Sequence, residues 1–260
     1  MTTPRATTTD SVACDMPSPA LVAEELLARL SEHANAENVT GMARFGIASA
    51  GTLGVSMPIV RSLAREGRKR LGRDKAAHHE LAGLLWVSGI HEARIMAALV
   101  DEPSLVDEPQ ADSWVADLDS WDVCDQLCLN LLRRCSFAWD KAAEWTTAEP
   151  EFVKRAGFVM GATLAVHEKA ADDASFLPLL EHAVREATDE RNGVKKAINW
   201  QIRQIGKRNA VLNAAAIDAC ERILAEHPDS AAARWAARGA LRELRSEAVK
   251  ERLGIEELGT

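Results

Sequence analysis

Four aspartates surround a single tryptophan in the stretch DLDSWDVCDQLC, residues 117–128. A helix that begins at Asp119 or Ser120 would explain two of these acids, because an N-cap position and the first helical turn both favour an anion. Trp121 and Asp125 are four residues apart, so they would project together from one face of that helix. Two interpretations are open. Trp121 could lie at the rim of the core beside a solvated acid, or it could form the wall of a binding site in which Asp125 contacts a cationic ligand.

A second tryptophan lies in a strongly basic stretch, NGVKKAINWQIRQIGKRN, residues 192–209, which contains no acid. On a helix, Lys196, Trp200 and Arg203 would share one face, while isoleucines fill the opposite face. An indole on a basic face is suited to stacking on a sugar or a base while cations hold phosphates. The cations of this stretch are Lys195, Lys196, Arg203, Lys207 and Arg208.

Two further cations, Lys154 and Arg155, stand near the start of the apolar stretch EFVKRAGFVM, residues 151–160. The helix dipole disfavours positive charge at this end of a helix. We therefore expect Lys154 and Arg155 to serve a purpose other than local helix stability.

These side chains must be positioned by helices, because the chain has many amphipathic helical segments and no credible strand pattern. Prolines at helix starts and glycines or polar residues at helix ends separate the segments. The expected helices cover 19–33, 58–71, 75–87, 90–101, 108–118, 120–134, 136–146, 150–168, 173–187, 190–206, 209–226 and 229–245. The sequence therefore predicts an all-α fold.

The sequence indicates how the helices are arranged less clearly than it indicates where they lie. Pairs of short amphipathic helices that recur every 35–45 residues, roughly, are typical of HEAT-like repeats, which stack into a solenoid. The repeat is loose in this sequence, so an irregular helical bundle is the alternative. In a solenoid, one helix of each pair would line a concave surface, which is the natural place for a ligand.

The overall charge of −8, with a pI of about 5.5, argues by itself against a nucleic-acid partner. The charge is uneven, however, because residues 61–75 carry seven cations and two acids, and residues 191–208 are also basic. Composition predicts a disordered lead over 1–18, a helical repeat domain over 19–245 and a tail over 246–260 that could add a short helix.

The cysteines and the apolar segments indicate the compartment. Five cysteines without a disulfide spacing fit a reducing cytoplasm, and Cys124, Cys128 and Cys135 are expected in the core. No stretch is long and apolar enough to span a bilayer, and the N-terminus lacks the apolar core of a secretory signal. We expect a cytoplasmic monomer with no cofactor and no membrane contact.

Two patterns that suggest other sites are better explained by structure. The glycines of 46–54 predict a turn between helices, because Thr52 stands where a phosphate-binding loop needs lysine. His78, His79 and His91 have no cysteine or aspartate at a metal-ligand spacing, so we expect them at a surface or an interface. No metal site is predicted.

Four short motifs follow one another along the chain: FGI…GVSMPIVRSLARE, SWDVCD, FVKRAGFVM and KKAINWQIR. With these motifs the chain resembles the AlkD-like DNA glycosylases of the DNA alkylation repair family, which are HEAT-like repeat proteins. The resemblance covers roughly residues 40–245. It implies a HEAT-like solenoid whose concave groove binds double-stranded DNA.

Members of that family carry Trp–Asp–x–x–Asp, then Arg–x–Ala, then Lys–Ala–Ile–x–Trp–x–x–Arg. This sequence has the first pattern at 121–125 and the third at 196–203, and at the place of the second it has Arg155 directly followed by Ala156. The resemblance implies that Asp125 is the catalytic carboxylate. It also implies that Trp121 and Trp200 form the aromatic walls of the cleft, and that Arg155 and Arg203 are its cations.

The first motif departs from that of the best-known members, which have Gln–Thr where Ser56 and Met57 stand before Pro58. This turn would contact the strand opposite the lesion, so these contacts differ from those of the family. The expected DNA contacts are Arg203, Lys196, Lys195, Lys154, Ser56, Lys207 and Arg208.

The resemblance implies hydrolysis of the N-glycosidic bond of cationic alkylated purines, such as 3-methyladenine and 7-methylguanine, in duplex DNA. Such a base leaves as a neutral molecule, so no strong general acid is needed, and positive charge develops on the deoxyribose. A carboxylate beside C1′ would stabilise that charge and orient the attacking water. Two indole faces would add cation–π attraction.

Two other functions remain open on the sequence alone. A non-catalytic HEAT-like protein would bind distorted or branched DNA with the same basic groove and release no base. The acidic overall charge and the changed turn at Ser56 and Met57 count in favour of this function, whereas the four motifs in order favour the glycosylase. A helical scaffold for another protein would show no salt-dependent DNA binding, whereas both DNA-binding functions require affinity to fall steeply as salt rises.

Overall fold

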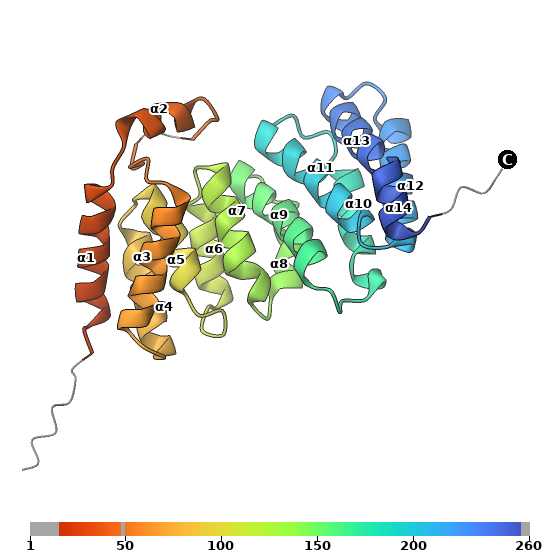
Figure 1. The fold of residues 1–260 in the computed structure, drawn as a ribbon. Coiled ribbons are helices and arrows are strands. Elements are labelled where there is room, and N and C mark those ends of the chain that lie inside the picture. Colours follow the sequence, from red (N-terminus) through yellow and green to blue (C-terminus); the bar gives the residue numbers. More distant parts are fainter. Residues whose placement is uncertain (1–15, 48–49, 256–260) are drawn as a thin grey trace, which may run out of the picture.

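The computed structural model describes residues 16–47 and 50–255, and every regular element within these ranges is a helix. The helices follow one another in an arc, with α1 and α14 at opposite ends of the molecule (Figure 1). In the described part of the chain, no helix combines the length and the apolar character that crossing a membrane requires. The predicted all-α fold is confirmed.

Most helices stack in two rows. The α3–α13 row consists of α3 (Met57–Arg70), α5 (His91–Val100), α7 (Trp121–Asn130), α9 (Glu151–His167), α11 (Asn192–Gly206) and α13 (Ala231–Leu244), each packed on the next. The α4–α12 row consists of α4 (Lys75–Val87), α6 (Glu108–Ala116), α8 (Ala138–Trp145), α10 (Leu177–Arg185) and α12 (Ala210–Glu226). Two rows of paired helices are the HEAT-like repeat architecture that the sequence predicts.

The ends of the arc and its shortest helices complete the fold. Helix α1 (Pro19–Glu32) packs on α3 and α4, and α14 (Glu247–Leu253) packs on α13. Single 3₁₀ turns, η1 (Leu132–Arg134) and η2 (Asp173–Ser175), follow α7 and precede α10. The last described helix therefore lies in the segment that the sequence analysis treats as a tail with a possible short helix.

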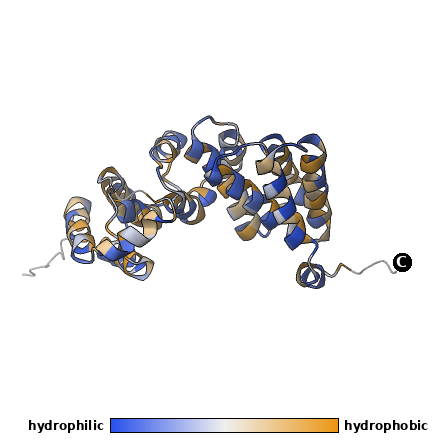
Figure 2. Cartoon of the chain, turned by 90° about the horizontal axis from the view of Figure 1, so that it is seen from above, coloured by the Kyte–Doolittle hydropathy of each residue, from blue (hydrophilic) through white to orange (hydrophobic). Residues whose placement is uncertain are grey.

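Local sequence signals explain where most helices begin and which side they bury. The side chains of Ser18 and Asp74 accept backbone hydrogen bonds in the first turns of α1 and α4. Hydrophilic residues lie along one side of most helices and hydrophobic residues along the other (Figure 2). The apolar sides meet in one continuous core that contains Cys124, Cys128 and Cys135, as predicted.

Two glycines of α9 allow its neighbours to approach closely. A Cβ atom at Gly157 would lie 2.5 Å from the backbone nitrogen of Thr146, just after α8. A Cβ atom at Gly161 would collide with the side chain of Gln201 on α11. The pair of glycines thus holds α9 tightly between α8 and α11, and it fixes the relative position of the side chains that α9 and α11 carry.

Helix α2 (Ala36–Ala43) is a helix that the sequence analysis missed. Its sequence, AENVTGMA, contains β-branched residues and a glycine, which have low helix propensity, and none of its residues is buried. Hydrogen bonds hold it instead. The Asn35 side chain caps the helix, and the Asn38 side chain donates to the carbonyl of Gly54.

The loop between α2 and α3 contains the glycine-rich segment 46–54, which is a connection between helices as predicted. Gly54 has a φ of 75°, and a Cβ atom there would collide with the carbonyl oxygen of Asn35. Glycine is therefore required at this position. The predicted disordered lead covers 1–18. Residues 1–15 lie outside the described residues, and Ser18 caps α1.

A buried carboxylate ties this loop to α5. Glu92 is 1% exposed. Its oxygens accept hydrogen bonds from the backbone nitrogens of Leu53 (3.0 Å), Gly54 (2.6 Å) and Val55 (3.1 Å). Because buried N–H groups need partners, this one side chain satisfies three donors and fixes the segment that leads into α3.

The histidines were predicted at a surface or an interface, and His78 and His91 are buried where helices of the protein meet. His78 contacts Glu102 at 3.4 Å, and His79, which is half-buried, contacts Asp101 at 2.8 Å. Such pairs satisfy polar groups between neighbouring helices. The described residues contain no cluster of histidine, cysteine and carboxylate side chains that could hold a metal ion.

Candidate functional site

A cleft of about 650 Å³ opens between α7, α9, α11 and the segment that follows α2. Three adjacent helices of the α3–α13 row each contribute side chains to it. Five residues that the sequence analysis selects from separate stretches line this cleft: Trp121 and Asp125 from α7, Arg155 from α9, and Lys196 and Trp200 from α11.

The carboxylate of Asp125 is held by a buried arginine. Nη2 of Arg155 donates to Oδ1 of Asp125 at 2.7 Å, and Nη1 donates to the backbone oxygen of Gly193 at 2.7 Å. The side chain of Asp125 is 20% exposed and that of Arg155 only 6%. Within the described residues, Oδ2 of Asp125 accepts no hydrogen bond, so this oxygen can face a ligand in the cleft.

The environment of Asp125 affects its charge in two opposing ways. Burial raises its pKa above the ordinary value of 3.8, because a low-dielectric surrounding disfavours the anion. The positive charge and hydrogen bond of Arg155 oppose this rise. Burial lowers the pKa of Arg155, but the charge of Asp125 more than compensates, so the guanidinium stays protonated. The cleft therefore contains a desolvated anion that one cation orients.

The aspartates around Trp121 have separate roles. Asp117 accepts a hydrogen bond from the indole nitrogen of Trp86 at 3.0 Å, and Asp119 is exposed. Asp122 is 2.9 Å from Nε2 of His91. Of the acids in this stretch, Asp125 is the one that lines the cleft.

The pair of Asp122 and His91 fixes the start of α7 on α5. Burial lowers the pKa of His91, and the hydrogen bond and charge of Asp122 raise it. Together with nearby acids, Asp122 outweighs burial, so the pKa of His91 lies above its ordinary value. Burial raises the pKa of Asp122, but His91 and the hydroxyl of Ser120 lower it below its ordinary value. Ser120 occupies the N-cap position as predicted, yet its hydroxyl donates to Asp122 instead of capping the backbone.

The segment after α2 reaches over to α7 and closes one side of the cleft. Nε1 of Trp121 donates to the backbone oxygen of Phe45 at 3.1 Å. Trp121 is 38% exposed and Phe45 is 74% exposed, so both rings present apolar surface at the cleft. Arg44 and Gly46 also line the cleft. No role for these three residues is evident from the sequence, although the first of the four motifs begins at Phe45.

A second hollow of about 720 Å³ lies on the other side of the contact between Phe45 and Trp121. Ser56 and Met57, at the start of α3, line this hollow together with His91. Ser56, one of the predicted DNA contacts, is therefore near the cleft but not in it.

Ion pairs within the protein explain the position of Lys154. Its Nζ atom lies 2.8 Å from Glu186 and 3.4 Å from Asp189, which follow α10. The cation at the start of α9 thus connects that helix to the segment before α11. Neighbouring Arg155 has its own partner in Asp125, so the two cations serve tertiary contacts rather than the stability of their own helix.

Four more predicted DNA contacts lie outside the cleft. Arg203 and Lys207 each lie 2.6 Å from Glu243 of α13. Arg208 donates to the backbone oxygen of Ala165 at 2.7 Å. Lys195 lies over the ring of Trp235 on α13.

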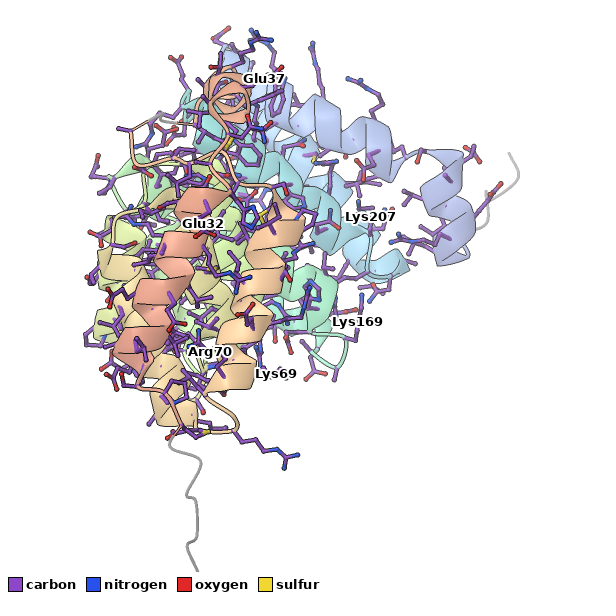
Figure 3. The ribbon with its side chains drawn as sticks, turned by 60° about the vertical axis from the view of Figure 1, so that its left-hand side comes forward. Glu32, Glu37, Lys69, Arg70, Lys169 and Lys207 are labelled. Carbon is purple, nitrogen blue, oxygen red and sulfur yellow. The ribbon has the colours of Figure 1, made fainter. Side chains whose placement is uncertain are left out.

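The ammonium of Lys207 lies well away from the cleft, because this residue follows the C-terminal end of α11. Figure 3 shows Lys207 beside Lys169, on a different part of the surface from Glu37 of α2. Lys169, Lys207 and Arg208 line a separate hollow of about 520 Å³. The structure therefore does not bring Lys207 or Arg208 together with Asp125.

Comparisons with known proteins identify the family. The family model described as DNA alkylation repair enzyme matches residues 26–244, which is most of the chain. The chain belongs to the DNA alkylation repair enzyme family. The match includes α7, α9 and α11, so the cleft lies inside the part that defines membership. A search of curated proteins gives no match.

A solved structure shares the fold of this family member. The two superpose with a TM-score of 0.69 and 16% sequence identity, over 91% of this chain and 98% of the other chain. That protein is described as one of a new family related to the HEAT-like repeat DNA glycosylases, with affinity for branched DNA structures. At this identity the likeness supports the HEAT-like repeat fold, and an activity has to be argued from the cleft.

Proposed function

We propose that this member of the DNA alkylation repair enzyme family is a DNA glycosylase. Its substrates would be cationic alkylpurines, such as 3-methyladenine and 7-methylguanine, in duplex DNA. The observation that supports the proposal most directly is the meeting of one carboxylate, Asp125, with two indoles, Trp121 and Trp200, in an open cleft.

The proposed reaction breaks the bond between C1′ of the deoxyribose and the ring nitrogen of the base. The bonding electron pair goes to the base, which was positively charged and leaves as a neutral molecule. Positive charge develops on the sugar, and a water oxygen then bonds to C1′. The water gives up one proton, which Asp125 accepts and passes to solvent.

Asp125 is suited to stabilise this transition state. A half-buried anion attracts a developing cation more strongly than a solvated one, because less water screens the charge. Arg155 acts as a positioning residue that holds Oδ1 and leaves Oδ2 directed at the sugar. Trp121 and Trp200 contribute ring faces that attract a cationic base by about 0.5–2 kcal/mol each.

DNA outside the reacting nucleotide would be held through its phosphates. Lys196 is exposed at the cleft, and Ser56 lies at the neighbouring hollow, so each can approach a strand beside the lesion. Arg203 can contribute only if a phosphate replaces its partner Glu243. Three of the predicted contacts are not expected to touch DNA, because acids and carbonyl oxygens of the protein already hold them: Lys154, Lys207 and Arg208.

The rate of base release should depend on pH through Asp125. Only the ionised carboxylate stabilises the cationic sugar, so the rate is expected to be level near neutral pH. It should fall as the pH drops through the raised pKa of Asp125, which lies above the ordinary 3.8. The measurement is the single-turnover rate against pH, corrected for spontaneous loss of the base. A rate that rises on acidification would mean that a protonated acid drives the reaction.

The experiment that tests the proposal compares two duplexes of one sequence. One contains a single cationic 7-methylguanine, and the other contains a neutral uracil at the same position. Chromatography of the freed bases should show release of 7-methylguanine and none of uracil. Equal release of both bases, or no release of either, would contradict the proposed activity.

Binding of branched DNA without catalysis is the second candidate. It is favoured because the solved structure with the same fold is described as having affinity for such DNA, and because Ser56 and Met57 depart from the family motif. This function predicts salt-dependent binding and no base release from either duplex. A protein scaffold would show neither binding nor release.

A further inference from the structure

Helix α13 carries a row of arginines that the proposed reaction does not use. Arg234, Arg238 and Arg242 are four residues apart, so they follow one side of the helix over about 12 Å. Arg238 and Arg242 are exposed, and Arg234 is half-buried. The three arginines line a hollow of about 390 Å³ with Asn199, Trp235 and Gly239.

These arginines lack the carboxylate partners that several other arginines of the protein have. Within the described part of the chain, none of the three forms an ion pair, and Arg234 donates to the backbone oxygen of Pro228 at 2.5 Å. Arg222 on α12, by contrast, pairs with Glu181 at 2.6 Å. In a chain of net charge −8, three unpaired guanidiniums on one side of a helix indicate a partner that supplies negative charge.

An exposed indole stands among these cations. Trp235 is 47% exposed, and Nζ of Lys195 lies 5.7 Å from the centre of its ring. Aromatic rings with surrounding cations are the usual means of holding a single strand, because a base stacks on the ring while the cations neutralise phosphates. The faces of paired bases are already stacked in a duplex, so an unpaired strand fits Trp235 better.

This surface adjoins the cleft across one helix. Lys196 and Trp200 line the cleft, whereas Lys195 and Asn199, the residues before them, face α13. Asn199 donates to the backbone oxygen of Ala236 at 2.7 Å, which holds α11 and α13 together. A strand that leaves the cleft over α11 therefore reaches Trp235 next.

We propose that Lys195, Arg234, Trp235, Arg238 and Arg242 form a site for an unpaired DNA strand, which we call the α13 site. A base stacks on Trp235, and successive phosphates lie along the row of arginines. The proposal rests on the proposed function in that DNA occupies the cleft. It also narrows the substrate to lesions in duplex DNA that continues into a single strand, as at a fork, a flap or a gap.

The test compares the binding of the full-length protein to a blunt duplex and to the same duplex with a single-stranded arm of about ten nucleotides. Fluorescence anisotropy should show about tenfold tighter binding of the armed duplex. Trp235→Ala should remove most of this gain, and Trp235→Phe should keep it. Arg222→Ala removes one half-buried arginine elsewhere, on α12, and this control should behave as wild type.

Two further measurements separate the contributions of phosphate and base. In the double variant, Arg238→Ala with Arg242→Ala, the plot of log affinity for the armed duplex against log salt concentration should be less steep. The slope should fall in magnitude by about two, one for each lost phosphate contact. A 2-aminopurine in the arm should change its fluorescence on binding to wild type and not to Trp235→Ala, because the change reports stacking.

The outcomes for the two proposals are distinguishable. Equal affinity for blunt and armed duplexes, or a gain that Trp235→Ala retains, would overturn the α13 site even if bases are released. A preference for the armed duplex that depends on Trp235, without release of any base, would leave the α13 site standing and contradict the glycosylase.

Discussion

Replacing Asp125 with asparagine should lower the single-turnover rate of 7-methylguanine release by about 10²–10³-fold. Asparagine has nearly the same shape, and its amide oxygen can still accept the hydrogen bond from Arg155. The change therefore removes negative charge while it preserves geometry. DNA affinity should change little, because phosphate contacts and not Asp125 would hold the DNA. Rates at saturating protein and affinities by anisotropy measure the two effects separately.

The matched control for this change is Asp218→Asn. Asp218 is an exposed aspartate on α12, in the other helix row, and its replacement removes the same charge from the protein. Its rate of base release should equal that of wild type. If Asp125→Asn also released the base within a few-fold of the wild-type rate, another group would have to stabilise the sugar.

Replacing Glu92 with alanine should produce the largest loss of stability among single changes near the site. The carboxylate accepts three backbone hydrogen bonds from the loop before α3, and it is almost completely buried. Its removal leaves buried donors without partners, which costs about 1–3 kcal/mol for each donor that water cannot reach. We expect a loss of about 3 kcal/mol, or a melting temperature lower by about 6–12 °C.

Thermal denaturation followed by circular dichroism measures this effect. Glu80→Ala on α4 is the control, because Glu80 is exposed, and its melting temperature should stay within about 1–2 °C of wild type. Base release by Glu92→Ala should also fall at temperatures where the protein is folded, because Gly54 connects the loop to α2 through Asn38. A wild-type melting temperature for Glu92→Ala would show that other groups satisfy the loop.

The helices could be predicted from sequence because their signals are local. Apolar residues at helical spacing, with a proline or a capping side chain before them, mark each start within a few residues. Thus 19–33 corresponds to α1, 150–168 to α9 and 190–206 to α11. Helix α2 has a capping side chain in Asn35 but buries no residue, and it depends on contacts with a loop some fifteen residues away.

The composition of the cleft could be predicted in part. Short motifs on α7, α9 and α11 select Trp121, Asp125, Arg155 and Trp200, and the packing of three successive helices brings them together. Phe45 was missed, because its place at the cleft depends on its backbone oxygen, which accepts the indole N–H of Trp121. A residue that acts through its backbone leaves no side-chain pattern to detect.

The sequence could not show which basic residues are free to contact DNA. Lys154 and Lys207 looked suited to phosphates by charge, but acids distant in the sequence, Glu186 and Glu243, hold them. Arg238 and Arg242 were not predicted, although Trp235 stands three residues before Arg238, because the sequence does not show that these arginines lack acidic partners. Only tertiary packing shows which cations are paired and which remain unpaired.

The role of Asp125 in base release is measured most directly by the bases that wild type and Asp125→Asn free from randomly methylated DNA. We expect wild type to free 3-methyladenine and 7-methylguanine, and the variant to free both about 10²–10³-fold more slowly while still binding the DNA. Release by the variant at the wild-type rate, or no release by wild type, would contradict the claim that Asp125 stabilises a cationic sugar in this cleft.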